Sequence, residues 1–262
     1  MKDYKKKYYE QSEHWSKDFS KIPPEVRRVK EIIEVIHNDV QTILDVGCGS
    51  GFFLDSLERK KRYKKLVGLD CSVEALKYVS TEKVQGNIAN LPFGNNSFDL
   101  VTCLEVLEHL PQEDFEKGIL ELQRVSKKNI LITVPNEDDL ARSLVMCPQC
   151  YCWFNPCFHI CSFNEDKLQN LFNNFRLMKL KKIYLFKQRY YPLLLLTIYH
   201  YYKKPTLPKT AICPQCGYQT EKCCNQDTKF SFAPFFLFKF LAKLIWHPKT
   251  KIRWLLAFYE KK

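Results

Sequence analysis

The sequence lacks the features of a secreted or membrane-spanning protein. Residues 1–7 lead into charged and aromatic residues with no apolar segment, so no secretory signal pattern is present. Two later stretches, 190–202 and 230–246, are rich in apolar and aromatic residues. Neither is a clean run of about 20 apolar residues of the kind that spans a bilayer. These absences predict a cytoplasmic protein.

Acidic residues are scarce in the C-terminal part. The 262 residues include 41 Lys and Arg and 29 Asp and Glu, which gives a formal charge of +12. Residues 1–146 carry 22 basic and 24 acidic side chains, a net −2, whereas residues 147–262 carry 19 and 5, a net +14. This asymmetry favours an anionic partner for the C-terminal part, either an anionic membrane surface or nucleic acid. A lysine-biased composition without such a partner is the alternative.

Glycine is also sparse, with eight residues, yet three of them alternate at Gly47, Gly49 and Gly51. The apolar run 42–46, which contains Asp45, predicts a buried strand before them, and 52–60 predicts a helix after them. Glycine lets the backbone turn sharply and approach a ligand. A strand, a glycine loop and a helix form the part of an open α/β fold that holds nucleotide-like ligands. A tight structural turn is the alternative.

The next segments continue an alternation of strands and helices. Residues 65–70 predict a second strand that ends in Asp70, whose carboxylate is placed to accept both hydroxyls of a ribose. The segment 86–93 contains Asn87, Ile88 and a Leu-Pro-Phe turn. A further strand, 98–103, leads directly into Leu104, and the sequence Glu-Val-Leu-Glu-His follows at 105–109.

Together these motifs resemble the class I S-adenosylmethionine-dependent methyltransferases. The glycine loop resembles their first motif, and 86–103 resembles their G-D-x-x-x-L-P-F and S-F-D-x-V segments. Asn87 stands where the family usually has Asp, and its carbonyl oxygen still accepts a bond from the adenine amino group, so at most weaker binding is expected. The resemblance implies a cofactor site formed by Asp45, Gly47, Gly49, Gly51, Asp70, Asn87, Ile88 and Leu104.

The segment 105–109 resembles the E-x-x-E-H signature of type 11 methyltransferases, which include ubiquinone-pathway O-methyltransferases. The resemblance implies that Glu105, Glu108 and His109 lie over the reaction site, and in some relatives such residues hold a divalent ion near the acceptor oxygen. Capping of the next helix is the alternative. His159 opens an H-x-x-x-F-x-x-x-x-L segment, in a helix predicted over 158–175. It is a candidate general base, with zinc binding or a plain surface role as alternatives.

Two C-P-x-C turns supply candidate metal ligands, Cys147, Cys150, Cys213 and Cys216. Each turn resembles a zinc knuckle, and two knuckles complete a closed tetrahedral site. The turns are farther apart in sequence than in ordinary zinc fingers. Packed or redox-buffered thiols are the alternative, and five other cysteines are possible substitutes as ligands: Cys152, Cys157, Cys161, Cys223 and Cys224.

The predicted fold is α/β, a doubly wound seven-stranded Rossmann-like methyltransferase sheet with a Cys-rich, apolar insertion. Residues 1–146 would form the cofactor-binding core with an N-terminal lid helix. Residues 147–251 would form the Cys-rich and amphipathic insertion, including strand six at 177–186. Residues 252–262 would form the strand that closes the sheet.

The function predicted from these features is S-adenosylmethionine-dependent methyl transfer to oxygen. The apolar, lysine-flanked stretches of the insertion favour a hydrophobic or lipid-linked acceptor and peripheral attachment to the inner face of a membrane. Methylation of RNA or protein, with the basic C-terminal part as the contact surface, is one alternative. A methyltransferase-like binding protein without catalysis is another.

Overall fold

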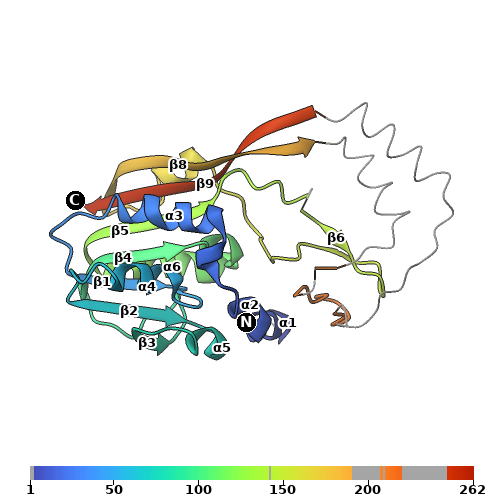
Figure 1. Ribbon diagram of the computed structural model, residues 1–262, viewed down its shortest axis with the longest axis horizontal. Helices are drawn as coiled ribbons and strands as arrows, with labels where there is room; N and C mark the ends of the chain where they lie inside the picture. The colour runs from blue at the N-terminus through green and yellow to red at the C-terminus, as the bar shows by residue number, and fades with distance from the viewer. Residues whose placement is uncertain (1–2, 142, 191–206, 209, 220–246) are drawn as a thin grey trace. The chain divides into compact units, whose positions relative to one another are not determined.

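The computed structural model describes residues 3–141, 143–190, 207–208, 210–219 and 247–262. The chain divides into two compact units. The first, here called the core unit, comprises residues 9–138, 160–184 and 252–262, and the second, the cysteine unit, comprises residues 1–8, 139–159 and 185–251. Each unit is described by itself (Figure 1).

A seven-stranded sheet forms the centre of the core unit, which confirms the predicted doubly wound architecture. Strands β3, β2, β1, β4 and β5 run parallel, and β9 pairs antiparallel with β5. The C-terminal strand therefore enters the sheet between β5 and β8, next to the edge. The order in the sheet is β3 (Glu82–Gln85), β2 (Lys65–Asp70), β1 (Thr42–Val46), β4 (Phe98–Leu104), β5 (Ser126–Pro135), β9 (His247–Lys261) and β8 (Phe175–Tyr190).

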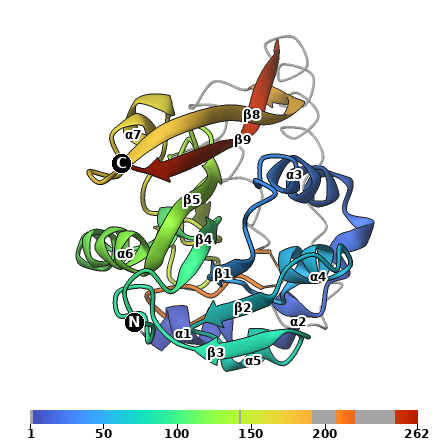
Figure 2. The ribbon, with the colours of Figure 1, turned by 90° about the vertical axis from the view of Figure 1, so that its left-hand side faces the viewer.

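The central strands are buried on both faces, which explains their continuous apolar sequences. Leu44 and Val46 of β1 pack with one cluster, and the neighbouring Ile43 packs with another. Figure 2 shows α6 (Gln112–Val125) and α7 (Glu165–Gln169) on one side of the sheet, and α3 (Pro23–Ile33) and α4 (Phe52–Glu58) on the other. The carboxyl ends of β1, β2 and β4 are thereby brought to one edge of the fold.

Short elements complete the chain before and between these helices. Helix α3 begins at a pair of prolines and ends at Ile33. The remaining elements are α1 (Asp3–Tyr9), α2 (Ser12–Trp15), η1 (Phe19–Lys21), α5 (Val73–Leu76) and η2 (Leu107–His109). No helix within the described ranges is long and apolar enough to cross a membrane.

The helix predicted over 158–175 is wrong in its extent. Phe158 has a φ of 58°, in the left-handed region, so a right-handed helix cannot continue through it. The helix α7 begins only after Asn164, whose side chain accepts a hydrogen bond from the backbone N–H of Lys167. A local cap therefore sets the helix start at Glu165, seven residues later than the sequence pattern predicts.

Little regular structure supports the described part of the cysteine unit. Strands β6 (Val145–Met146) and β7 (Trp153–Phe154) form a two-stranded hairpin that carries the first C-P-x-C turn. The second turn is closed by an isolated bridge between Ile212 and Gln219. An aromatic group joins α1 to this unit, since the rings of Tyr4 and Tyr8 lie 5.4 and 4.9 Å from that of Phe158.

Candidate functional site

The glycine loop turns back against strand β2. Gly47, Gly49 and Gly51 all have positive φ values, of 77°, 53° and 83°, which other residues adopt only with strain. The backbone N–H groups of Gly47 and Cys48 both donate to the carbonyl of Leu69, at 2.7 and 3.0 Å. The loop is therefore fixed at the carboxyl ends of β1 and β2, the place where an open α/β fold holds its ligand.

Asp70 fixes the same loop from the end of β2. Its carboxylate accepts from the N–H of Gly49 at 2.8 Å and from the N–H of Ser72 at 2.9 Å. Burial raises the pKa of this carboxyl group, and the backbone donors oppose the shift. Since each carboxylate oxygen has a second lone pair, the ribose-binding role predicted for Asp70 is compatible with these bonds.

Asp45 lies one residue before the end of β1, inside the sheet. It is 2% exposed, and its Oδ1 accepts a hydrogen bond of 2.7 Å from the hydroxyl of Thr102. Burial raises the pKa of Asp45 to about 7, with the Thr102 hydroxyl and Arg28 opposing the shift. The predicted contact of Asp45 with the cofactor stays a prediction.

The segment expected to face the adenine follows β3. Asn87 is exposed and accepts a bond from the N–H of Ala89 at 2.9 Å, whereas Ile88 is buried beneath it. Ile88 packs against α6, where a Cβ on Gly118 would meet its side chain at 3.1 Å. The buried isoleucine and the exposed amide together fix the orientation of this turn.

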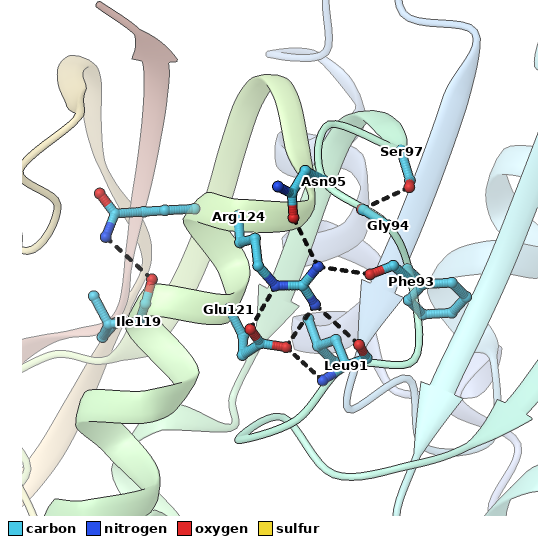
Figure 3. Close-up of polar contacts among 9 residues, drawn as sticks. Leu91, Phe93, Gly94, Asn95, Ser97, Ile119, Glu121 and Arg124 are labelled. Atoms are coloured by element: carbon cyan, nitrogen blue, oxygen red, sulfur yellow. Dashed lines mark hydrogen bonds and ion pairs between the residues drawn. The ribbon is translucent and has the colours of Figure 1, made fainter.

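An ion pair on α6 holds the rest of that segment (Figure 3). The guanidinium of Arg124 donates to Glu121, to the carbonyls of Leu91 and Phe93, and to the side chain of Asn95. Glu121 in turn accepts from the N–H of Leu91 at 2.7 Å. The spacing of three residues on a helix is a local signal for this pair, whereas its contacts with residues 91–95 have no such signal.

The acidic segment after β4 lies beside the glycine loop. A Cβ on Gly47 would lie 2.3 Å from Cγ2 of Val106, so the Val106 side chain packs against the loop where only a glycine leaves room for it. Glu105 has a φ of 59°, an uncommon value for a residue other than glycine and one that often marks a functional site. The structure thus brings Glu105, Glu108 and His109 to the edge of the fold where the glycine loop and Asp70 lie.

The carboxyl groups of Glu105 and Glu108 have different surroundings. Glu105 lies 3.7 Å from Nη1 of Arg28, which also contacts Thr133 and pairs with Glu25. Glu108 is 1% exposed, and neither of its side-chain oxygens has a hydrogen-bond partner among the described residues. Burial, and next the charge of Glu105, raise the pKa of Glu108 well above its ordinary value. Burial also raises the pKa of Glu105, with Arg28 opposing.

Arg28 is a site residue that the sequence does not reveal. It comes from α3, more than 70 positions before the carboxylate that it faces, and it lies over the Trp254 ring at 5.2 Å from the centroid. His159, the other predicted acid or base, belongs to the cysteine unit, whereas Glu108 and His109 belong to the core unit. The role of His159 stays a prediction.

The cysteine unit brings the four predicted metal ligands together. One ligand atom from each of Cys147, Cys150, Cys213 and Cys216 lies within 4.8 Å of the others. The Sγ atoms of Cys147 and Cys216 are 3.6 Å apart, and those of Cys150 and Cys213 are 3.5 Å apart. A tetrahedron with zinc–sulfur bonds of about 2.3 Å has edges of about 3.8 Å, so these spacings suit a zinc ion. Cys152 is also close, at 3.3 Å from Cys213.

The two turns have the same backbone geometry. Tyr151 N–H donates to the carbonyl of Cys147, and Gly217 N–H donates to that of Cys213, both at 3.0 Å. Tyr151 and Gly217, each directly after the second cysteine, have φ values of 62° and 74°. Although burial opposes it, hydrogen bonds from the N–H groups of residues 216 and 215 lower the pKa of Cys213 to about 6, whereas burial raises the pKa of Cys147, Cys152 and Cys216. The Cys213 thiol therefore favours the thiolate form that binds metals.

Comparison with known proteins agrees with this geometry. Residues 44–133, about a third of the chain, match the family model described as a methyltransferase domain. The mitochondrial ubiquinone biosynthesis O-methyltransferase of Saccharomyces cerevisiae is 28% identical over 146 residues, 44% of this chain and 47% of that protein. The small RNA 2'-O-methyltransferase of Arabidopsis thaliana is 28% identical over 139 residues, 45% of this chain and 14% of that protein.

A solved structure extends the similarity of fold over most of the chain. A Bacillus halodurans protein classed as a methyltransferase has a TM-score of 0.53 and 16% identity, and the match covers 93% of this chain and 98% of that one. Strand order, glycine loop and acidic strand end define a class I S-adenosylmethionine-dependent methyltransferase fold. Residues 44–133 are thus similar to a methyltransferase domain, and the chain has a methyltransferase fold. It spans less than half of the length of the curated relatives that it matches first.

Proposed function

We propose that this protein is an S-adenosylmethionine-dependent O-methyltransferase. The cofactor would lie along the glycine loop, with Asp70 at its ribose and Asn87 with Ile88 at its adenine. The sulfonium methyl group is already electrophilic, so positioning in line with the acceptor supplies much of the rate. The protein's remaining chemical task is to remove the proton of the acceptor hydroxyl.

The observation that carries the proposal is the buried Glu108 carboxyl. Burying a carboxyl group without hydrogen-bond partners costs stability, so such a group at the end of a central strand is better explained by function than by folding. Burial raises its pKa, so its ionised form is a stronger base than an ordinary carboxylate. His109 is adjacent, with Nε2 at 3.7 Å from Glu108 Oε1. Glu108 and His109 would thus receive and pass on the acceptor proton.

A divalent ion also fits this pair, because a carboxylate and an imidazole suit such an ion. When bound, the ion would polarise the acceptor oxygen. Glu105 suits it less well, since its carboxyl group already faces the positive charge of Arg28. In this proposal, Glu108 and His109 would hold the ion, and the ion pair with Arg28 would keep Glu105 out of the ligand set.

The acceptor that we propose is hydrophobic or lipid-linked. Support comes from the apolar, lysine-flanked sequence of the insertion and from the relative named for ubiquinone biosynthesis. The apolar stretches at 193–196 and 235–246 lie outside the described residues. The net +14 of residues 147–262 would add attraction to an anionic membrane surface and peripheral attachment to the inner face of a membrane.

RNA is the second candidate acceptor. It is favoured by the relative named as a small RNA 2'-O-methyltransferase and by the same basic excess. Both candidates use a hydroxyl acceptor, so the proposed roles of Glu108 and His109 apply to either. A binding protein without catalysis would leave the raised pKa and burial of Glu108 unexplained.

For the cysteine cluster we propose a structural zinc ion held by Cys147, Cys150, Cys213 and Cys216. Four thiolates complete a closed tetrahedral site with no position open for a substrate. Cys152 would then remain outside the ligand set, as a nearby thiol. Cys223 and Cys224 lie outside the described residues.

Methyl transfer from labelled S-adenosylmethionine tests the proposal. Lipid extract and small RNA are offered in parallel, with and without a chelator, and products one methylene heavier are sought by mass spectrometry. Glu108→Gln should lower transfer by about 100-fold or more, the usual size of a lost acid or base, while cofactor binding stays within about twofold. Glu113→Gln, an exposed carboxylate on α6 paired with Lys117, is the control and should transfer normally.

The outcomes separate the parts of the proposal. A methylated lipid without methylated RNA supports the favoured acceptor, and the reverse result replaces it. Full activity of Glu108→Gln would remove Glu108 from the chemistry. Activity that survives the chelator would remove the divalent ion and leave Glu108 with His109 as the proton acceptors.

A further inference from the structure

The segment Tyr9–Trp15, here called the strap, lies against the glycine loop. A Cβ on Gly49 would lie 2.8 Å from Cζ3 of Trp15, so the indole ring is in contact with the backbone that would face the cofactor. The indole N–H of Trp15 donates to the carbonyl of Tyr9, and the two rings are stacked with centroids 6.5 Å apart. The strap is thus a short turn that is closed by the bond between Trp15 and Tyr9 and that lies against the glycine loop.

A carboxylate fastens the strap to the end of β2. The two side-chain oxygens of Glu10 accept from the N–H groups of Val73 and Glu74, at 3.1 and 3.0 Å. These are the first N–H groups of α5, which have no partner within the helix. The hydroxyl of Ser72 adds a bond of 2.8 Å to the carbonyl of Tyr9. Figures 1 and 2 show α2, which ends the strap, beside α5.

The strap also reaches the acidic segment after β4. The Tyr9 ring meets the His109 ring edge to face, with centroids 6.2 Å apart. One seven-residue segment therefore contacts the glycine loop, the residues next to Asp70, and one of the proposed catalytic side chains. A segment that only covered apolar surface would not need a charged side chain bonded to two backbone donors.

We propose that Glu10 is a positioning residue that latches the strap across the cofactor site, so that cofactor enters and leaves only when the Glu10 bonds to α5 open. This inference rests on the proposed function, since it requires S-adenosylmethionine at the glycine loop. While latched, Trp15 would limit access to the loop and Tyr9 would hold the His109 ring. Release of the two Glu10 bonds and the Ser72 bond frees the strap as one piece.

Rates of cofactor exchange distinguish a latch from a merely structural contact. A latch slows both the entry and the exit of the cofactor. Glu10→Ala should therefore raise the association rate and the dissociation rate of S-adenosylmethionine together, by about fivefold to tenfold. This is the size expected from the loss of a capping carboxylate. Damage to the binding surface would instead raise the dissociation rate alone. Glu10→Gln keeps one acceptor oxygen and should give a smaller change of the same kind. Stopped-flow binding and displacement by S-adenosylhomocysteine measure the two rates.

A control variant and a hydrogen-exchange measurement accompany this test. Glu113→Gln removes an exposed carboxylate on another helix and should leave both rates unchanged. Hydrogen exchange at Val73 and Glu74 should accelerate in Glu10→Ala, while exchange in β4 and β5 stays as in the parent. Unchanged rates in a variant that binds the cofactor would overturn the latch and leave the proposed function standing. A parent protein that binds no S-adenosylmethionine would overturn both.

Discussion

In the core unit, a sheet buried on both faces supplies most of the structure, and polar residues at its carboxyl edge are fixed by backbone hydrogen bonds. In the described part of the cysteine unit, the regular structure consists of α1, one hairpin with two residues per strand, and the ends of β8 and β9, and its buried apolar side chains form no layer like that of the sheet. The thiols of this unit's two C-P-x-C turns cluster instead: Cys147, Cys150, Cys213 and Cys216. We therefore expect the core unit to be stable from its own packing, and we expect the cysteine unit to depend on the proposed zinc ion.

Removal of the metal should have the largest effect, because it tests this dependence directly. Apparent binding free energies of structural zinc are about 10–16 kcal/mol in small domains, so chelation or Cys213→Ser should unfold the cysteine unit. The core unit should keep its cooperative melting transition. Elemental analysis and a two-probe melt measure both results, with Cys157→Ser, an exposed thiol outside the cluster, as the control.

A fully stable, metal-free preparation would show that packing alone holds the cysteine unit. If Cys152→Ser lost zinc as completely as Cys213→Ser, the ligand set would have to include Cys152 in place of a predicted ligand.

Within the core unit, Asp70→Ala should weaken S-adenosylmethionine binding by about 100-fold or more, since charge-assisted bonds are worth roughly 1.5–3 kcal/mol each. The variant loses the predicted ribose contacts and also the bond to Gly49 that shapes the loop. Asp70→Asn keeps one acceptor oxygen and should lose less. Isothermal titration measures the affinity for S-adenosylmethionine. If Asp70→Ala bound the cofactor within about threefold of the parent, a difference under about 1 kcal/mol, the placement of the ribose at Asp70 would be wrong.

The contrast between the units also explains what the sequence alone could reveal. Strands such as 42–46 and 98–104 are continuous apolar runs, and the glycine spacing is local, so periodicity and spacing located both the sheet and the loop. The C-P-x-C turns are equally local. Each of these features is complete within about ten residues.

Contacts between distant segments leave no such signal. Glu10 caps α5 across 63 positions, and Arg28 contacts Thr133 across 105 positions. Glu108 was identified by its motif, but its separation from Glu105 depends on where Arg28 lies after folding. The helix predicted over 158–175 failed because a left-handed residue and a single cap outweighed its apolar spacing.

A pH-dependent effect concerns the buried carboxyl group of Asp45 in the core unit. The folded pKa of Asp45, about 7, lies above its ordinary value, so its contribution to stability is full at low pH and is lost as the pH rises through 7. Asp45→Asn keeps an oxygen for the Thr102 hydroxyl and removes the charge. The variant should therefore gain about 4 kcal/mol relative to the parent at pH 8 and less than about 1 kcal/mol at pH 4, since the pKa is raised from 3.8 to about 7 and each unit corresponds to about 1.4 kcal/mol.

Denaturant melts of both proteins at the two pH values measure this difference. Other titrating groups are common to the pair and cancel. An equal difference at pH 4 and pH 8 would mean that Asp45 does not change its protonation over this range.

The smallest expected effect compares the two knuckles with each other. Tyr151 and Gly217 occupy equivalent left-handed positions, yet only the glycine adopts that conformation without strain. Tyr151 is 68% exposed, and a Cβ on Gly217 would meet no atom within 4 Å, so packing contributes little at either position. Gly217→Ala should then weaken zinc retention by about 1 kcal/mol, and Tyr151→Gly should strengthen it by up to the same amount, with Tyr151→Ala near the parent. Competition with a calibrated chelator measures the zinc affinity of all three variants. If Gly217→Ala and Tyr151→Gly changed this affinity in the same direction, the two turns would not be equivalent.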